Sequence, residues 1–275
     1  MHNTVFIAGP SASGKSTLSR RLAQEIGFNW LDTGSVIRMT ALVMEQRGIG
    51  LPYSDETALD TPCPPWAIGH MDQPGEVPIY VDGNLLDYDD PRLRNPTFDT
   101  STLHLARALR PRTWNLLRDV STIGQSVISC RQVPELLHHD DAVLPLYLDL
   151  SPQERVARRA RYEHKAVDPE ITRRIVEKEE QNIALGNLVS PEEALDKDYV
   201  LVRNDGTPER SIAQMLLEVL RRYEHYNPED YESVLQRLQI VDPTLKHFTC
   251  WSELVGILNL NVHPEGYIRH SKEIF

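Results

Sequence analysis

The chain has 275 residues, 40% of them hydrophobic, which is enough for a sizeable α/β domain carrying insertions. It carries 29 basic and 40 acidic residues, a formal net charge of -11, which argues against a broad grip on a DNA or RNA backbone. Its three cysteines lie far apart without a Cys-x-x-Cys pair, which disfavours a disulfide framework and a structural zinc site. No apolar stretch reaches the length of a membrane span, and the first residues lack a signal-peptide pattern. We therefore expect a soluble, cytoplasmic protein whose partners include neither nucleic acid nor a membrane.

The first motif follows an apolar run at residues 4–8. Residues 9–17 read Gly-Pro-Ser-Ala-Ser-Gly-Lys-Ser-Thr, and a helical pattern follows from residue 18. This strand, turn and helix carry the G-x-x-x-x-G-K-S spacing of a phosphate loop. In such a loop the glycines let main-chain amides face the phosphates, the lysine reaches the β- and γ-phosphates, and the next hydroxyl binds Mg²⁺. The motif predicts a Mg²⁺-dependent nucleoside triphosphate site formed by Gly9, Ser11, Ala12, Ser13, Gly14, Lys15, Ser16 and Thr17.

Further along the chain, strand-like apolar runs alternate with amphipathic helical stretches. This alternation predicts an α/β fold, a parallel sheet of the P-loop NTPase type flanked by helices. The strand-like runs occupy residues 28–31, 126–130, 144–150 and 199–202. The first helix is expected to stop at Gly27, and a late helix to begin after a cap at Thr207.

Residues 51–78 contain six prolines, which predicts an irregular insertion. The insertion leads into residues 79–84, a short strand that we expect to turn at Asp82-Gly83. Residues beyond 223 begin another helix and then continue without a motif, so their role cannot be read.

Asp32 follows the second strand-like run, at the sheet edge where ligands gather in open α/β folds. A carboxylate there orients Mg²⁺-bound water, whereas the alternative is a cap for the helix that starts near Thr33. A second feature is a run of four arginines at 155, 158, 159 and 161, three of them at helical spacing. We expect Arg155 and Arg159 to reach the triphosphate, and the alternative is a solvated basic helix face.

The opening of the chain resembles the cytidylate kinase family. The resemblance is carried by residues 9–17, by Gly27-Phe28 and by Leu31-Asp32-Thr33-Gly34 with Arg38. Later blocks agree in order: Val81-Asp82-Gly83-Asn84 with residues 91–96, Leu105-Ala106 with Arg112, residues 127–131, and residues 141–159. The similarity extends over roughly residues 3–222.

The resemblance implies a P-loop nucleoside monophosphate kinase that transfers the γ-phosphoryl group of ATP to a pyrimidine monophosphate with Mg²⁺. It places an acceptor-side insertion at 51–98 and a lid at 155–190 within a kinase-like domain of residues 1–222, and leaves 223–275 as an α-helical C-terminal extension. Together the motif and the resemblance assign catalysis to Lys15, Asp32, Arg131, Arg155 and Arg159, metal binding to Ser16 and Asp32, and acceptor binding to Thr33, Arg38, Arg112 and Arg131. Each acceptor-side arginine has the alternative of an ordinary surface residue.

The departures from the family concern the acceptor. Where the family carries Asp-Gly-Arg-Asp, this chain has Ser129-Cys130-Arg131-Gln132, and residues 178–185 lack the Arg-Asp-rich lid pattern. Because a substrate group left without its hydrogen-bond partner costs about 1–3 kcal/mol, these changes predict an altered acceptor. We expect an ATP-dependent phosphotransferase acting on a nucleoside monophosphate or a related small metabolite. The alternative is a catalytically weak ATP-binding switch that engages a protein partner through 223–275.

Overall fold

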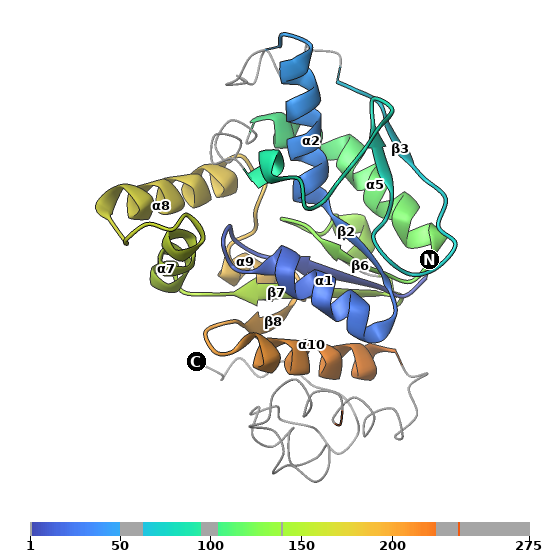
Figure 1. Cartoon of the computed structure of the whole chain (residues 1–275). Helices are drawn as coiled ribbons and strands as arrows, with labels where there is room; N and C mark the ends of the chain where they lie inside the picture. The colour runs from blue at the N-terminus through green and yellow to red at the C-terminus, as the bar shows by residue number, and fades with distance from the viewer. Residues whose placement is uncertain (1, 50–62, 95–103, 139, 224–235, 237–275) are drawn as a thin grey trace. The chain divides into compact units, whose positions relative to one another are not determined.

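The computed structural model describes residues 2–49, 63–94, 104–138, 140–223 and 236 (Figure 1). The chain divides into two compact units, Met1–Asp205 and Gly206–Phe275, and the first contains every predicted site residue. The predicted C-terminal extension lies outside the described residues except for residues 223 and 236, so its role stays a prediction. In the part of the chain that is described, no helix is long and apolar enough to cross a membrane.

A parallel sheet of five strands forms the centre of the first unit, in the order β2-β6-β1-β7-β8. The strands are β1 (Thr4–Ala8), β2 (Asn29–Asp32), β6 (Ser126–Ser129), β7 (Val143–Asp149) and β8 (Val200–Arg203). Every residue of β1, β2 and β6 is buried, as in a parallel sheet with both faces covered. The predicted parallel α/β sheet is therefore confirmed, with strand bounds shifted by at most one residue.

The longer helices that pack on this sheet are α1 (Lys15–Ile26), α2 (Thr33–Gln46) and α5 (Arg110–Ile123). Helix α1 contacts β1, β2 and β6, whereas α2 and α5 contact β6. Figure 1 shows α2 and α5 above the sheet. Helix α1 ends at Gly27, whose φ of 69° is left-handed, so the predicted glycine stop is confirmed.

The insertion carries a small antiparallel sheet made of β3 (Trp66–Ile68), β4 (Ile79–Val81) and β5 (Asn84–Leu85), followed by the 3-10 turn η1 (Pro91–Arg94). The predicted turn at Asp82-Gly83 is confirmed, with φ of 55° and 76° at the two residues. In the described part of the predicted irregular insertion, residues 63–78, the regular element is the three-residue edge strand β3, and proline is tolerated just before such a strand. Residues 51–62 and 95–98 of the predicted insertion lie outside the described residues.

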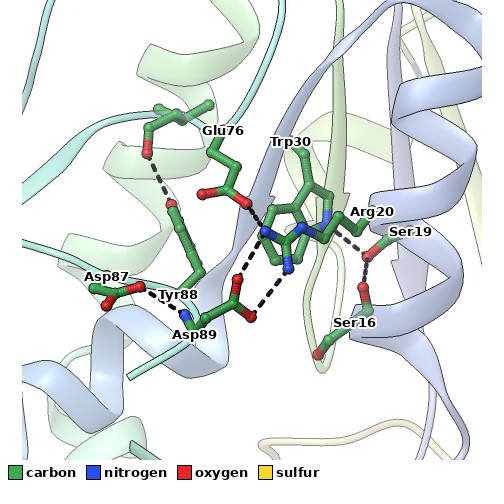
Figure 2. A network of polar contacts seen from close by, with 9 residues as sticks. Ser16, Ser19, Arg20, Trp30, Glu76, Asp87, Tyr88 and Asp89 are labelled. Carbon is green, nitrogen blue, oxygen red and sulfur yellow. Dashed lines mark hydrogen bonds and ion pairs between the residues drawn. The ribbon is translucent and has the colours of Figure 1, made fainter. Parts of the chain in front are cut away.

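A polar network joins the insertion to α1 (Figure 2). The guanidinium of Arg20 donates to both carboxylate oxygens of Asp89, at 3.1 and 3.0 Å, and also pairs with Glu76. The same guanidinium lies 5.2 Å from the ring centroid of buried Trp30, whose indole N–H donates to Ser19 Oγ at 2.8 Å. The helix that begins at the glycine-rich loop is thus attached to the insertion.

Two helices, α7 (Pro152–Tyr162) and α8 (Pro169–Ala184), follow β7 and lie side by side (Figure 1). Val156 and Ala160 of α7 pack with Ile171 and Ile175 of α8, and Ala12 packs against this cluster. The short helices α6 (Glu135–His138) and α9 (Pro191–Asp196) complete the first unit. In the second unit, α10 (Pro208–Arg222) is capped by Thr207, whose hydroxyl accepts from the amide of Arg210, so the predicted cap is confirmed.

Candidate active site

The glycine-rich loop joins β1 to α1, and its shape requires both glycines. Gly9 and Gly14 have φ of 135° and 93°, which side-chain-bearing residues rarely adopt. A Cβ on Gly9 would stand 2.6 Å from the carbonyl oxygen of Leu148, and one on Gly14 would stand 3.0 Å from Asn204 Nδ2. Both positions therefore require glycine, because the loop packs closely against the backbone of β7 and the side chain of Asn204.

Within this loop, Ser13 fits a bound anion. Its side chain is 0% exposed, and its Oγ has no hydrogen-bond partner among the described residues. A buried hydroxyl without a partner is costly, and a phosphate oxygen would satisfy it. The main-chain carbonyl of Ser13 accepts from Asn204 Nδ2 at 2.6 Å, so the loop is also held from the end of β8. The loop thus fits the triphosphate that its motif predicts.

Lys15 lies at the start of α1, and its ammonium donates to the carbonyl of Pro10 at 2.6 Å. Burial, and then the positive charge of Arg131, lower the pKa of Lys15 to about 7. A triphosphate would oppose both effects, because nearby negative charge favours the protonated amine. An anion bound at the loop is therefore expected to raise the pKa of Lys15.

Asp32 ends β2 and is 5% exposed. It occupies the N-cap position of α2 but makes no capping hydrogen bond with its side chain. Instead, its Oδ2 accepts from Ser35 Oγ at 2.7 Å and from an Arg38 amino group at 3.2 Å. The carboxylate thus does not act as a helix cap, whereas its predicted metal role stays a prediction.

The predicted acceptor residues separate into two groups. Thr33 donates to the carbonyl of Ser129 at 3.0 Å, and Arg131 follows the same strand, so both lie at the carboxyl ends of β2 and β6. Arg112 instead donates to the carbonyls of Cys63 and Pro64, at 3.4 and 2.9 Å. Its guanidinium also lies 4.9 Å from the ring centroid of Trp66 in the insertion.

A cavity of about 50 Å³ lies beside Arg131. Its polar lining comes from Thr33, Arg110, Thr113, Arg131, Gln132 and Asn187. Arg110 donates to the carbonyl of Leu185 at 2.8 Å and to Asn187 Oδ1 at 3.0 Å. Burial, and next the charge of Arg107, lower the pKa of Arg110. The cavity therefore carries two guanidinium groups, from α5 and from the end of β6.

The arginines of α7 have different surroundings. Arg155 is 2% exposed, donates to the carbonyl of Leu150 at 3.2 Å and pairs with Glu179. Arg159 pairs with Glu163. Arg158 approaches the loop: it bonds to the carbonyl of Asn204, and its Nη1 lies 3.4 Å from where a Cβ of Gly14 would stand. The run is therefore not a uniformly solvated face.

Comparison with known proteins shows to which family this chain belongs. The model of the cytidylate kinase family matches residues 5–198. The chain belongs to the cytidylate kinase family. It is 29% identical over 218 residues to a cytidylate kinase of Actinobacillus succinogenes, covering 77% of this chain and 96% of the relative. A second cytidylate kinase, from Syntrophotalea carbinolica, is 28% identical over 244 residues, with coverages of 87% and 95%.

As a member of this family, the chain is a phosphotransferase, and its reaction is ATP-dependent phosphoryl transfer to a nucleotide. Among solved structures, a gluconokinase from Sinorhizobium meliloti 1021 covers 81% of this chain and 94% of its own, at 13% identity and a TM-score of 0.44. Similarity at that level does not bear on the acceptor.

Relative to the family motifs, sequence reasoning missed three residues that the fold brings to the site. Asn204 directly follows β8, and its place at the carboxyl edge of the sheet is the signal that would have found it. Arg158 was visible within the arginine run, but spacing alone did not distinguish it from Arg155 and Arg159. Arg110 lies two residues before Arg112, where only the packing of α5 determines which guanidinium faces the cavity.

Proposed function

We propose that this member of the family transfers the γ-phosphoryl group of ATP to a nucleoside monophosphate, with Lys15 and Arg131 at the junction of donor and acceptor. The observation that carries the proposal is their place at one edge of the sheet: the loop with Lys15 follows β1, Arg131 follows the neighbouring strand β6, and the charge of Arg131 contributes to lowering the pKa of Lys15. Phosphoryl transfer depends on positioning and on neutralising the charge of the transferred group. Two neighbouring cations, one in the loop and one at the end of β6, meet that requirement.

On the donor side, residues 9–17 hold the triphosphate, with the amides and Ser13 facing the phosphate oxygens. Arg158 and Asn204 support this loop from the lid and from the end of β8. A cavity of about 320 Å³ begins at Pro10 and is lined by Asp149, Leu150, Arg203 and Asp205. We assign this cavity to the nucleoside of ATP, because it starts at the loop and opens at the carboxyl ends of β7 and β8.

Ser16 and Asp32 are the residues that fit Mg²⁺. Among the described residues no group of three or more His, Cys, Asp or Glu side chains is arranged to hold a metal ion. Mg²⁺ in nucleotide sites takes one or two protein oxygens together with phosphates and water, so a hydroxyl and one carboxylate suffice. When bound, the ion supplies neutralisation of the β- and γ-phosphate charge.

In the transfer, the bond between the γ-phosphorus and its bridging oxygen breaks, and the electron pair leaves on ADP. An oxygen of the acceptor's monophosphate supplies the pair for the new bond. Because the second pKa of a phosphate monoester is about 6, this oxygen is already deprotonated at neutral pH and needs no general base. The protein groups therefore position and neutralise rather than move protons.

The acceptor cavity favours a nucleotide rich in hydrogen-bond acceptors. Among the described residues that line it there is no carboxylate, whereas Arg110 and Arg131 only donate. The neutral oxygens of Gln132, Thr33 and Thr113 are weaker partners for an exocyclic amino group, such as that of cytosine, than the two guanidinium groups are for an oxo group. We expect UMP, which presents oxo groups, to be phosphorylated more efficiently than CMP.

The test is ADP formation with ATP, Mg²⁺ and each of CMP, UMP, dTMP, AMP and GMP, with formation of the diphosphate product measured by chromatography. We expect transfer to at least one monophosphate, with kcat/KM for UMP above that for CMP. Transfer to none of them by folded protein that binds Mg·ATP would refute the acceptor class. A higher kcat/KM for CMP than for UMP would refute only the specificity.

A further inference from the structure

One face of α5 lines the acceptor cavity beside Arg131. The residues of this helix that line the cavity are Arg110, Thr113, Trp114 and Leu117. Residues at spacings of three and four positions lie on the same side of an α-helix, so these four form one face of α5. Leu117 is fully buried, whereas Trp114 is 36% exposed. An indole ring therefore lies where the cavity meets the solvent.

The tryptophans elsewhere in the described ranges have partners that account for their positions. The indole N–H of Trp30 donates to Ser19 Oγ at 2.8 Å, and that of Trp66 donates to Thr40 Oγ1 at 2.9 Å. Each of these two rings also contacts an aromatic ring or a guanidinium group. Trp114 makes neither kind of contact with the residues that the structure describes. Its ring face is thus free to contact a ligand in the cavity.

The rest of the cavity lining shows which ligand fits. Arg110 and Arg131 supply positive charge, and the apolar lining besides Trp114 comes from Ile37, Ala106, Leu117 and Cys130. Guanidinium groups bind phosphate oxygens, and aromatic side chains stack on nucleobases. A nucleoside monophosphate combines a negatively charged phosphate with a flat base. The lining therefore matches both parts of such a molecule.

The topology of the sheet determines which way round the acceptor lies. The phosphate loop follows β1 and Arg131 follows the neighbouring strand β6, so the acceptor phosphate belongs beside Arg131. Helix α5, which carries Trp114, packs on β6 from one face of the sheet. A cavity of about 50 Å³ does not enclose a whole nucleotide. The base is therefore expected at the open side of the cavity, where the indole lies.

We propose that the indole of Trp114 stacks on the base of the acceptor nucleotide. The inference rests on the proposed function for the class of acceptor, and it adds the residue that holds the base. Because every base has a π-face, stacking is tolerant of base identity. Trp114 thus strengthens the binding of UMP and CMP alike, whereas the polar lining of the cavity discriminates between them.

The test measures by calorimetry the binding of UMP, CMP and ribose 5-phosphate, which lacks a base. Trp114→Leu keeps an apolar side chain but removes the aromatic ring. We expect this variant to bind UMP and CMP about 10-fold or more weakly, by similar factors, and ribose 5-phosphate within about threefold of wild type. Trp114→Phe, which keeps a ring, should stay within about threefold for all three ligands. Ile123→Ala, at the exposed end of the same helix and outside the cavity lining, should match wild type.

Two further readouts separate stacking from a structural role. In assays of ADP formation, Trp114→Leu should raise the KM of UMP by the same factor while leaving kcat and the KM of ATP within about threefold of wild type. Binding of UMP should quench the tryptophan fluorescence of wild type, and this quenching should be smaller in Trp114→Phe. An unchanged affinity for UMP in Trp114→Leu overturns the inference. Equal losses of affinity for UMP and ribose 5-phosphate, or equal quenching in Trp114→Phe, also overturn it.

The outcomes also separate this inference from the proposed function. If wild type phosphorylates UMP and Trp114→Leu binds UMP normally, the function stands and the role of Trp114 is refuted. If wild type binds UMP but phosphorylates no monophosphate, the function is refuted, and the binding comparison alone decides the role of Trp114. Binding of no monophosphate by folded wild type refutes both.

Discussion

The phosphate loop is one continuous segment of the chain, whereas the acceptor cavity is lined by residues from several segments that are distant in sequence. The loop is a single segment, whose shape follows from Gly9 and Gly14 and whose donors are main-chain amides. The cavity collects side chains from α2, α5, the end of β6 and the segment after α8. Its polar contacts join residues 51 and 77 positions apart, Arg131 with Asn182 and Arg110 with Asn187. Donor binding is thus a property of local backbone geometry, whereas acceptor choice depends on how distant elements pack.

The strongest way to separate the two regions is to remove the loop cation. Lys15→Met should lower kcat/KM by about 1000-fold, because it takes a positive charge from the donor phosphates and from the transferred group at once. The measurement is ADP formation with the preferred monophosphate, and calorimetry should show weaker Mg·ATP binding as well. Lys197→Met, at an exposed lysine, serves as the matched control. A variant that keeps a tenth of the wild-type kcat/KM contradicts the role of Lys15.

The donor side was largely predictable from sequence, for a physical reason. The loop is one short stretch of chain that includes the strand, the two glycines, the lysine and the hydroxyl. The spacing of these residues in the sequence therefore determines how they are arranged in space. Likewise, the helix stop at Gly27 and the turn at Asp82-Gly83 follow from left-handed backbone conformations that glycine adopts readily. Asp32 was placed at the correct sheet edge, but only the structure decides between capping and its contacts with Ser35 and Arg38.

The acceptor side is tested by comparing two arginines that the family resemblance treats alike. Arg131→Gln should raise the KM of the acceptor about 10- to 100-fold while leaving the Kd of Mg·ATP within threefold, because a charged contact to the acceptor phosphate is lost. Arg112→Gln should change that KM less, since its guanidinium is bonded to the carbonyls of Cys63 and Pro64. Steady-state kinetics with varied acceptor, together with thermal unfolding, separates the two.

The outcome that contradicts this assignment is a larger rise in acceptor KM for Arg112→Gln than for Arg131→Gln. In that case the insertion would have to rearrange on binding, so that Arg112 leaves Trp66 and turns toward the acceptor. A lower unfolding temperature with unchanged kinetics in Arg112→Gln is the expected result, because two carbonyls lose their donor.

The acceptor side was less predictable because its contacts are tertiary. Sequence reasoning placed Arg131 at a strand end, where topology alone locates it, but it had no basis for choosing Arg110 over Arg112 on the same helix. For the same reason, spacing alone could not separate the arginines of α7: Arg158 bonds to the carbonyl of Asn204 beside the loop, whereas Arg155, which pairs with Glu179, lines the cavity that begins at Pro10. In each case, residues of one type lie close together, and packing with a distant element decides which one faces the site.

The smallest predicted effect is the uptake of a proton when ATP binds, which depends on both regions. In the free protein the pKa of Lys15 is about 7, so at pH 8 the amine is mostly neutral, and bound ATP should raise this pKa. Binding at pH 8 should therefore take up close to one proton, and affinity should fall as pH rises from 7 to 9, by at most about tenfold per pH unit. Calorimetry in two buffers of different ionisation enthalpy measures the uptake.

The control for this proton uptake comes from the acceptor side. Arg131 lowers the pKa of Lys15, so Arg131→Gln should raise it, leaving more of the amine protonated before ATP arrives. The variant should then take up fewer protons at pH 8 than wild type, even though its affinity for ATP at pH 7 is nearly unchanged. Equal uptake by the two proteins would mean that the acceptor-side cation does not reach Lys15, and that donor and acceptor sites are electrostatically separate.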